Sequence, residues 1–97
     1  MLIGLSKLLS MENKNKKCAC CGFLTLEGMF DICPVCYWQK DFFQEEHIDD
    51  NGGPNLVSLR EAKENFKKYS AIERRFKEVV RLPTDAEKSI NNKMEQT

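Results

Sequence analysis

Hydrophobic residues near the start of the chain are packed into one dense run. Residues 23–32 read FLTLEGMFDI, and Glu27 and Gly28 divide the run near its middle. Gly28 can adopt the positive φ of a tight turn without steric cost, so the run predicts a β-hairpin with strands Phe23–Leu26 and Met29–Ile32. Both faces of this hairpin are largely apolar, and an isolated two-stranded ribbon is marginally stable in water. We therefore expect another part of the chain to cover one face.

The second half of the chain has the spacing of amphipathic helices. Ser58, followed three residues later by Glu61, forms a capping box, and apolar residues then recur at helical intervals. Ser70 and Glu73 form a second capping box, and Pro83 ends the helix that follows it. We expect two helices, joined with almost no linker, that cover the hairpin. The apolar positions are Leu59, Ala62, Phe66 and Tyr69 in the first helix, and Ile72, Phe76, Val79 and Val80 in the second.

Residues 39–57 separate these two halves and are acidic and irregular. The run Gly52–Asn55, Gly-Gly-Pro-Asn, indicates a loop. Because Gly52–Ala62 is unusually distinctive for a linker, we consider it a candidate partner surface. His47, the only histidine, stands among acidic residues that would suit a second cation. Acid-rich loops are usually just solvated, and we favour that interpretation here.

The chain has 97 residues, which suits one small domain, and we expect the α+β class. Its hydrophobic fraction is 41% and its charged fraction 31%, as in globular proteins, and no segment has the apolar length needed to cross a bilayer. A domain this small often depends on a metal or on disulfides. We expect a flexible extension over 1–16, a folded domain over 17–83 (17–55 the hairpin region and loop, 56–83 the helices) and a polar tail over 84–97.

The formal net charge is zero, but charge is unevenly distributed. Residues 1–17 carry +3, residues 18–55 carry −6, residues 56–83 carry +4 and residues 84–97 carry −1. Such a division suits either two separate partner surfaces or two solvated faces of opposite sign. We favour the solvated faces.

The five cysteines all lie between positions 18 and 36. Four of them form two Cys-x-x-Cys units, Cys18 with Cys21 and Cys33 with Cys36, separated by eleven residues. Each unit can wrap into a knuckle whose two sulfurs point at one ion, and Gly22 suits a knuckle that needs a positive φ. We therefore expect all four cysteines to bind one structural Zn²⁺ in a zinc-ribbon arrangement. Iron remains an alternative, because tetrahedral sulfur coordination suits both metals.

The cysteines and the N-terminus also indicate the compartment. An odd number of clustered cysteines does not suit a disulfide framework. The first ten residues lack the basic start and the small-residue cleavage site of a secretory signal peptide, and Met11 is an alternative start of the chain. We therefore expect a reducing, cytoplasmic location.

Cys20 is left over between the two ligands of the first unit. It is a candidate nucleophile or redox thiol, or an alternative ligand. A zinc ion with four thiolates carries a formal charge of −2, however, which raises the pKa of a neighbouring thiol. We favour an inert thiol and no enzyme activity, with a thiol-redox or hydrolytic enzyme using Cys20 as the alternative. Tyr37 and Trp38 are expected to cover the metal site and to join the core with Phe42 or Phe43.

The basic residues of the two helices raise the alternative of a nucleic-acid-binding zinc ribbon. Acidic residues are interspersed among them, and three oppositely charged pairs stand at i,i+4 spacing. We favour a solvated, self-paired helix surface over a phosphate-binding one. The expected pairs are Arg60–Glu64, Glu64–Lys68 and Glu73–Lys77.

The order of several motifs resembles the bacterial cysteine-rich CPCC family of small proteins. The resemblance covers residues 17–83, with Ala19 in place of the proline for which the family is named. It implies a zinc-binding bacterial cytoplasmic protein and implies little about the biological role. The motifs are Cys18-Ala19-Cys20-Cys21-Gly22, Cys33-Pro34-Val35-Cys36-Tyr37-Trp38, Asp41, Gly52-Gly53-Pro54-Asn55, Ser58-Leu59-Arg60-Glu61-Ala62, Asn65-Phe66 and Val80-Arg81-Leu82-Pro83.

These observations together predict a zinc-stabilised binding module. We expect the partner to be another protein, in an accessory, antitoxin-like or immunity-like role, and we expect no membrane partner. The charge asymmetry and the lack of a catalytic set of residues motivate this hypothesis.

Overall fold

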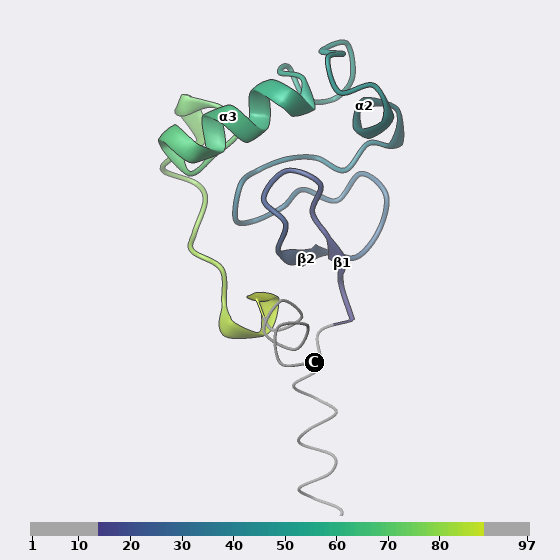
Figure 1. The fold of residues 1–97 in the computed structure, drawn as a ribbon. Helices are drawn as coiled ribbons and strands as arrows, with labels where there is room; N and C mark the ends of the chain where they lie inside the picture. The colour runs from purple at the N-terminus through teal and green to yellow at the C-terminus, as the bar shows by residue number, and fades with distance from the viewer. Residues whose placement is uncertain (1–13, 89–97) are drawn as a thin grey trace, which may run out of the picture.

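The computed structural model describes residues 14–88, and it has a small α+β fold (Figure 1). Residues 1–13, which hold most of the flexible extension expected over 1–16 and the alternative start at Met11, lie outside the described part, as do residues 89–97. Lys16, the last residue of the expected extension, belongs to strand β1. Residues 85–88 are also helical. The elements, in chain order, are β1 (Lys16–Lys17), β2 (Leu24–Leu26), α2 (Phe42–Glu46), α3 (Leu59–Tyr69) and the 3₁₀ helix η1 (Arg74–Phe76).

The strand pairing differs from the predicted hairpin. β2 pairs antiparallel with β1, with Lys16 opposite Leu26 and Lys17 opposite Leu24. The predicted partner of β2, Met29–Ile32, does not pair with it. Gly28 also lacks the positive φ that the predicted turn would have used.

Residues 30–32 pair instead with the segment that follows the second Cys-x-x-Cys unit. The N–H of Phe30 donates to the carbonyl of Lys40 at 3.0 Å, and Ile32 forms a β-bridge with Gln39. Each Cys-x-x-Cys unit is thus flanked by its own pair of extended segments. A closed knuckle already holds its two flanking segments close together, so pairing them costs little further loop-closure entropy.

The two knuckles have the same backbone structure. In each knuckle, the N–H of the first cysteine donates to the carbonyl of the residue five positions later. The N–H of the fourth residue after this cysteine donates to the carbonyl of the cysteine. That fourth residue has a positive φ in both knuckles, 84° at Gly22, as predicted, and 76° at Tyr37. The bond lengths are 2.8 Å (Cys18 to Phe23) and 2.9 Å (Gly22 to Cys18) in the first knuckle, and 2.9 Å (Cys33 to Trp38) and 2.8 Å (Tyr37 to Cys33) in the second.

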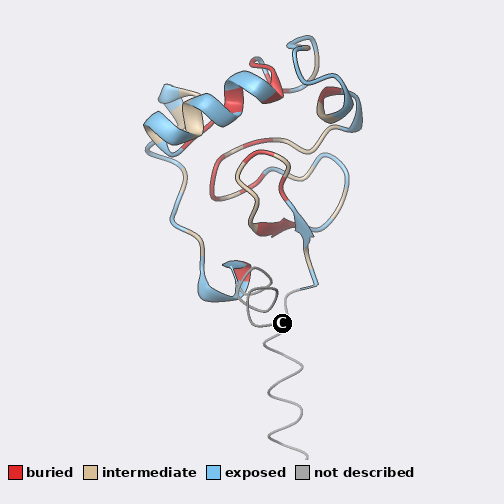
Figure 2. Cartoon of the chain, in the orientation of Figure 1, coloured by how far each residue is buried: buried red, intermediate tan, exposed pale blue. Residues whose placement is uncertain are grey.

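The first predicted helix is confirmed as α3. The hydroxyl of Ser58 accepts the N–H of Glu61 at 3.1 Å, as the capping box predicts. Leu59 and Ala62 are buried and Phe66 is half-buried, so the apolar face of α3 packs on the knuckles. Figure 2 shows the buried positions on this face of α3 and in the knuckle loops below it.

The second predicted helix is wrong. Ser70 does not begin a helix but ends α3, with a left-handed φ of 63°. Ala71 and Ile72 are then buried, and the N–H of Ile72 donates to the carbonyl of Cys36 at 2.9 Å. This long-range hydrogen bond holds the chain against the second knuckle. Between Ile72 and residue 84, only the single turn η1 is helical.

The C-terminal part of the described chain crosses the second knuckle and runs down one side of the molecule (Figure 1). The N–H of Arg81 donates to the carbonyl of Pro34 at 3.1 Å. Glu87 is buried although it stands in the expected polar tail. Glu87 is therefore packed against the domain, whereas residues 84–86 and 88 are exposed.

Aromatic residues are placed partly as expected. Trp38 is completely buried, and its indole N–H donates to Glu45 at 3.0 Å. Phe42 and Phe43 are 60% and 54% exposed, so the expectation that one of them joins the core is wrong. The aromatic partner of Tyr37 is Phe76, with ring centroids 4.3 Å apart.

The Gly-Gly-Pro-Asn loop has a structural role. The side chain of Gln44 is fully buried, and its amide donates to the carbonyls of Asp50 and Asn55. The side chain of Asn55 in turn binds both the N–H and the carbonyl of Gln39, each at 2.8 Å. A Cβ on Gly53 would lie 2.7 Å from Gln44, so glycine makes room for this network. These contacts account for much of the distinctiveness of the loop.

Charged residues pair differently from the three i,i+4 pairs that we predicted. Arg60 binds Asp49 at 2.7 Å, and Lys67 lies 3.9 Å from Glu64. The partner of Arg60 comes from the loop before α3, and that of Lys67 lies one turn away on α3. The expected Glu73–Lys77 pair is not formed, because the helix that would have held these two residues together is absent. No helix among residues 14–88 is both long and apolar enough to span a bilayer.

Candidate metal centre

The structure brings the sulfurs of Cys18, Cys21, Cys33 and Cys36 together, all within 4.8 Å of one another. The two closest pairs each join one knuckle to the other, Cys18 to Cys36 at 3.6 Å and Cys21 to Cys33 at 3.7 Å. Cys21 is half-buried and the other three are buried. These are the four ligands expected from the sequence, and their arrangement fits a single metal ion held between two knuckles.

The sulfur separations agree with tetrahedral coordination. Sulfurs at roughly 2.3 Å from a central ion, in a tetrahedron, lie about 3.8 Å from one another. A disulfide would need about 2.05 Å. None of the five cysteines, all of which are among the described residues, forms one. A set of four sulfur ligands also excludes ions that prefer oxygen, such as Mg²⁺ and Ca²⁺.

Hydrogen-bond donors surround the sulfurs of the second knuckle. The N–H of Val35 donates to Cys33, and that of Trp38 donates to Cys36, both at 3.4 Å. The hydroxyl of Thr25 donates to Cys33 at 2.9 Å. Donors of this kind stabilise thiolate charge and orient the ligand. Thr25 did not stand out in the sequence, because nothing local indicates that β2 faces the second knuckle.

Hydrogen bonds among the four thiols lower the pKa of some of them and raise the pKa of others. The pKa of Cys33 is lowered, first because the thiol of Cys18 donates to its sulfur, then because those of Cys21 and Cys36 do, although burial opposes the shift. The pKa of Cys36 is raised, first by its hydrogen bond with Cys18. The hydrogen bonds to Cys33 thus favour its thiolate, the form that binds metal.

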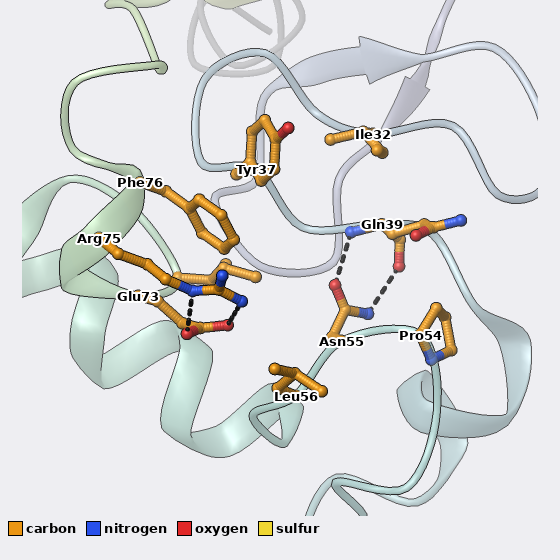
Figure 3. A pocket seen from close by; sticks show the side chains of 10 residues that line it. Ile32, Tyr37, Gln39, Pro54, Asn55, Leu56, Glu73, Arg75 and Phe76 are labelled. Atoms are coloured by element: carbon orange, nitrogen blue, oxygen red, sulfur yellow. Dashed lines mark hydrogen bonds and ion pairs between the residues drawn. The ribbon is translucent and has the colours of Figure 1, made fainter.

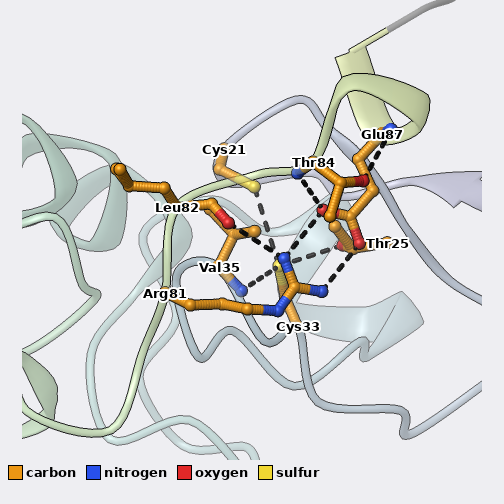
Figure 4. Close-up of polar contacts among 8 residues, drawn as sticks. All are labelled: Cys21, Thr25, Cys33, Val35, Arg81, Leu82, Thr84 and Glu87. Carbon is orange, nitrogen blue, oxygen red and sulfur yellow. Dashed lines mark hydrogen bonds and ion pairs between the residues drawn. The ribbon is translucent and has the colours of Figure 1, made fainter.

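An ion pair between Arg81 and Glu87 lies beside Cys33 (Figure 4). The guanidinium of Arg81 donates to both carboxylate oxygens of Glu87, at 2.9 and 2.8 Å. The pKa of Arg81 is raised, chiefly by Glu87 and to a smaller extent by the negative charge of Cys33. Arg81 therefore places a cation near the thiolates. Sequence reasoning missed this role, since it assigned Arg81 to a helix surface.

The remaining candidates do not form a second metal site. Cys20 is 9% exposed and packs in the same buried cluster as the ligands. His47 is exposed, and its ring stacks on Phe43 with centroids 4.0 Å apart. Among residues 14–88, the four-cysteine cluster is the only group with the geometry of a metal site.

The fold and the cluster define a small α+β protein organised around a candidate four-cysteine metal centre. The family model described as Cysteine-rich CPCC matches residues 16–87, and the chain belongs to this family. The resemblance inferred from the motifs is thereby confirmed. The match runs from the first residue of β1 to Glu87, so it includes the Arg81–Glu87 pair. No curated protein shows a significant match to the chain.

Proposed function

We propose that the protein is a zinc-stabilised binding module of the cytoplasm whose partner is another protein. The four converging sulfurs are the observation that carries the metal part of this proposal. Zn²⁺ suits them because it prefers tetrahedral thiolate sites and structural zinc sites use four protein ligands. Unpaired cysteines in such a site require a reducing compartment, which supports a cytoplasmic location.

The zinc would have a structural role. Four protein ligands leave no open position for a substrate or a water molecule, which catalytic zinc sites retain. Cys18, Cys33 and Cys36 are also buried, with exposed fractions of 1% or less. The metal would therefore hold the two knuckles together, and they in turn position the surface of the domain.

A surface hollow beside the second knuckle supports a protein partner (Figure 3). Its rim carries exposed Ile32 and Leu56, and its wall contains the rings of Tyr37 and Phe76, which contact each other at a tilt of 35°. The guanidinium of Arg75 lies 4.4 Å from the centre of the Phe76 ring. Aromatic and arginine side chains beside exposed apolar ones are typical of protein interfaces.

Metal analysis of the reduced, purified protein tests the zinc assignment. We expect one equivalent of zinc per chain and no visible absorption. A coloured protein would indicate iron, and a metal-free protein with an unchanged fold would contradict the structural role.

Affinity capture under mild conditions tests the partner assignment, with the surface variant Leu56→Glu beside the parent. Leu56 is 64% exposed, so the substitution should leave the fold intact while it removes binding at the hollow. Val79→Glu is the matched control, because Val79 is 59% exposed and does not line the hollow. A protein captured equally by all three chains would argue against this surface.

A further inference from the structure

A second hollow, of about 410 Å³, lies beside the first knuckle. One wall consists of residues 17–22, and the other of Lys63, Phe66 and Lys67 on α3. Its volume is within the range of sites that hold small ligands, roughly 300–1,000 Å³. It shares no residue with the hollow of Figure 3.

The equivalence of the two knuckles explains why this hollow is open. In the second knuckle, the ring of Tyr37 projects from the position with positive φ and packs against the ring of Phe76. Gly22 holds that position in the first knuckle, where a Cβ would have no heavy atom within 4 Å. The side chain that fills the surface of one knuckle is therefore missing from the other.

Three lysines surround the hollow, and they are poorly matched by carboxylates. Within residues 14–88, Lys17 and Lys63 have no ion-pair partner, and Lys67 approaches Glu64 only to 3.9 Å. The self-paired helix surface that we expected from the sequence is therefore not formed here. Four other cations have a carboxylate within 2.8 Å, namely Lys40, Arg60, Arg75 and Arg81.

The cationic surface continues along α3. A neighbouring hollow of about 250 Å³ shares Lys63 and Lys67 and extends to Arg60, which Asp49 binds, with Glu64 in its wall. Arg60, Lys63 and Lys67 stand at i, i+3 and i+7, so they lie on one face of the helix over about 10 Å. A trough of this length suits an extended polyanion better than a single small anion.

We propose that this trough binds the phosphodiester backbone of single-stranded nucleic acid. Lys17 and Lys63 approach it from two different elements and can neutralise successive phosphates. Phe66 lines the same hollow, and an aromatic ring beside a cationic groove is the arrangement on which bases stack. An acidic peptide would use the lysines but would gain nothing specific from stacking on the ring.

The same lysines would also offset the formal charge of −2 on a zinc tetrathiolate. That role predicts loss of metal when the lysines are removed, whereas nucleic-acid binding predicts loss of affinity with the metal retained. The two readouts are independent of the Leu56 experiment, so failure here leaves the proposed function standing.

Fluorescence anisotropy of the zinc-loaded full chain with a labelled single strand of about twelve nucleotides tests the proposal. We expect log K to fall with log salt with a slope of about −2, since each of three phosphate contacts contributes about −0.7. Lys63→Gln/Lys67→Gln should reduce the slope by about 1.4 and weaken binding about tenfold or more at low salt. Phe66→Leu, which keeps an apolar side chain, should weaken binding about fivefold or more.

The double variant Arg74→Gln/Lys77→Gln is the matched control, because it removes the same charge from outside the trough. It should bind within about twofold of the parent. The proposal is overturned if single strands do not bind at low salt, if both double variants lose affinity equally, or if a polyglutamate peptide competes as well as the oligonucleotide. Loss of zinc from Lys63→Gln/Lys67→Gln would also overturn it, in favour of the charge-offsetting role.

Discussion

The carboxylate of Glu87 is held by the guanidinium of Arg81 through two hydrogen bonds, beside Cys33 of the thiol cluster. Glu87 also accepts the N–H of Thr84, and its own N–H donates to the Thr84 hydroxyl. The pair thus fastens the last described residues to the second knuckle. It is the farthest point along the described chain at which a side chain is buried.

Replacement of Glu87 by Gln should destabilise the protein at neutral pH by about 1–2 kcal/mol, a modest value because Arg81 is 46% exposed. The pKa of Glu87 is lowered, chiefly by Arg81, from an ordinary value of 4.5. A lowered folded-state pKa contributes stability above the unfolded pKa and loses it as pH falls through the folded pKa. The difference in free energy of unfolding between parent and variant should therefore shrink below about pH 4.5. Urea denaturation at pH 7 measures the difference in stability, and NMR titration of the Glu87 side chain measures its pKa; a Glu87 pKa at or above 4.5 would contradict the prediction.

Replacement of Cys33 by Ser should abolish the folded state under conditions in which the parent is stable. Loss of a thiolate ligand removes much of a binding energy that amounts to roughly 10 kcal/mol or more in small zinc domains. Circular dichroism with and without added zinc measures the effect. Cys20→Ser is the control, because Cys20 is also buried, at 9% exposed, but is not one of the four clustered sulfurs. It should retain one equivalent of metal, and a Cys33 variant that melts like the parent would refute the structural role.

Replacement of Thr25 by Val should weaken metal binding about tenfold or more with little change in shape. The substitution removes the hydroxyl that donates to Cys33 at 2.9 Å. Competition with a chromophoric chelator measures the metal affinity. Thr25→Ser keeps the hydroxyl and should restore most of the affinity. Valine keeps the methyl group and lacks only the hydroxyl, so a Thr25→Val variant that binds metal as tightly as the parent would contradict the role of this hydrogen bond.

Replacement of Gly22 by Ala should cost about 1–2 kcal/mol, because the φ of 84° is unfavourable for any residue with a Cβ. No steric clash contributes, since the added Cβ meets no heavy atom within 4 Å. Gly28→Ala is the matched control, with equal space and no positive φ. Thermal unfolding of the zinc-loaded proteins compares the two, and equal melting temperatures would contradict the expected backbone strain at Gly22.

The features that the sequence determined are local or repeated. Two Cys-x-x-Cys units predict two knuckles because three-residue spacing brings both sulfurs of a unit to one side, and the structure joins all four. The capping box at Ser58 predicts the start of α3, because the hydrogen bond that it requires spans only three residues. Gly22 follows from the same short-range geometry.

The tertiary structure decided what depends on contacts distant in sequence. Ser70 has the same local pattern as Ser58, yet it ends a helix, because Ile72 binds the backbone of Cys36 and is buried there. The pairing of β2 with β1 could not be predicted locally either, because Met29–Ile32 also has strand-forming residues. In the structure, the two segments that flank each knuckle pair with each other. The hydrogen bond from the Thr25 hydroxyl to Cys33 also depends on how β2 is placed beside the second knuckle, which no local pattern indicates. A local pattern states which conformations a segment can adopt, and the burial available elsewhere in the chain selects among them.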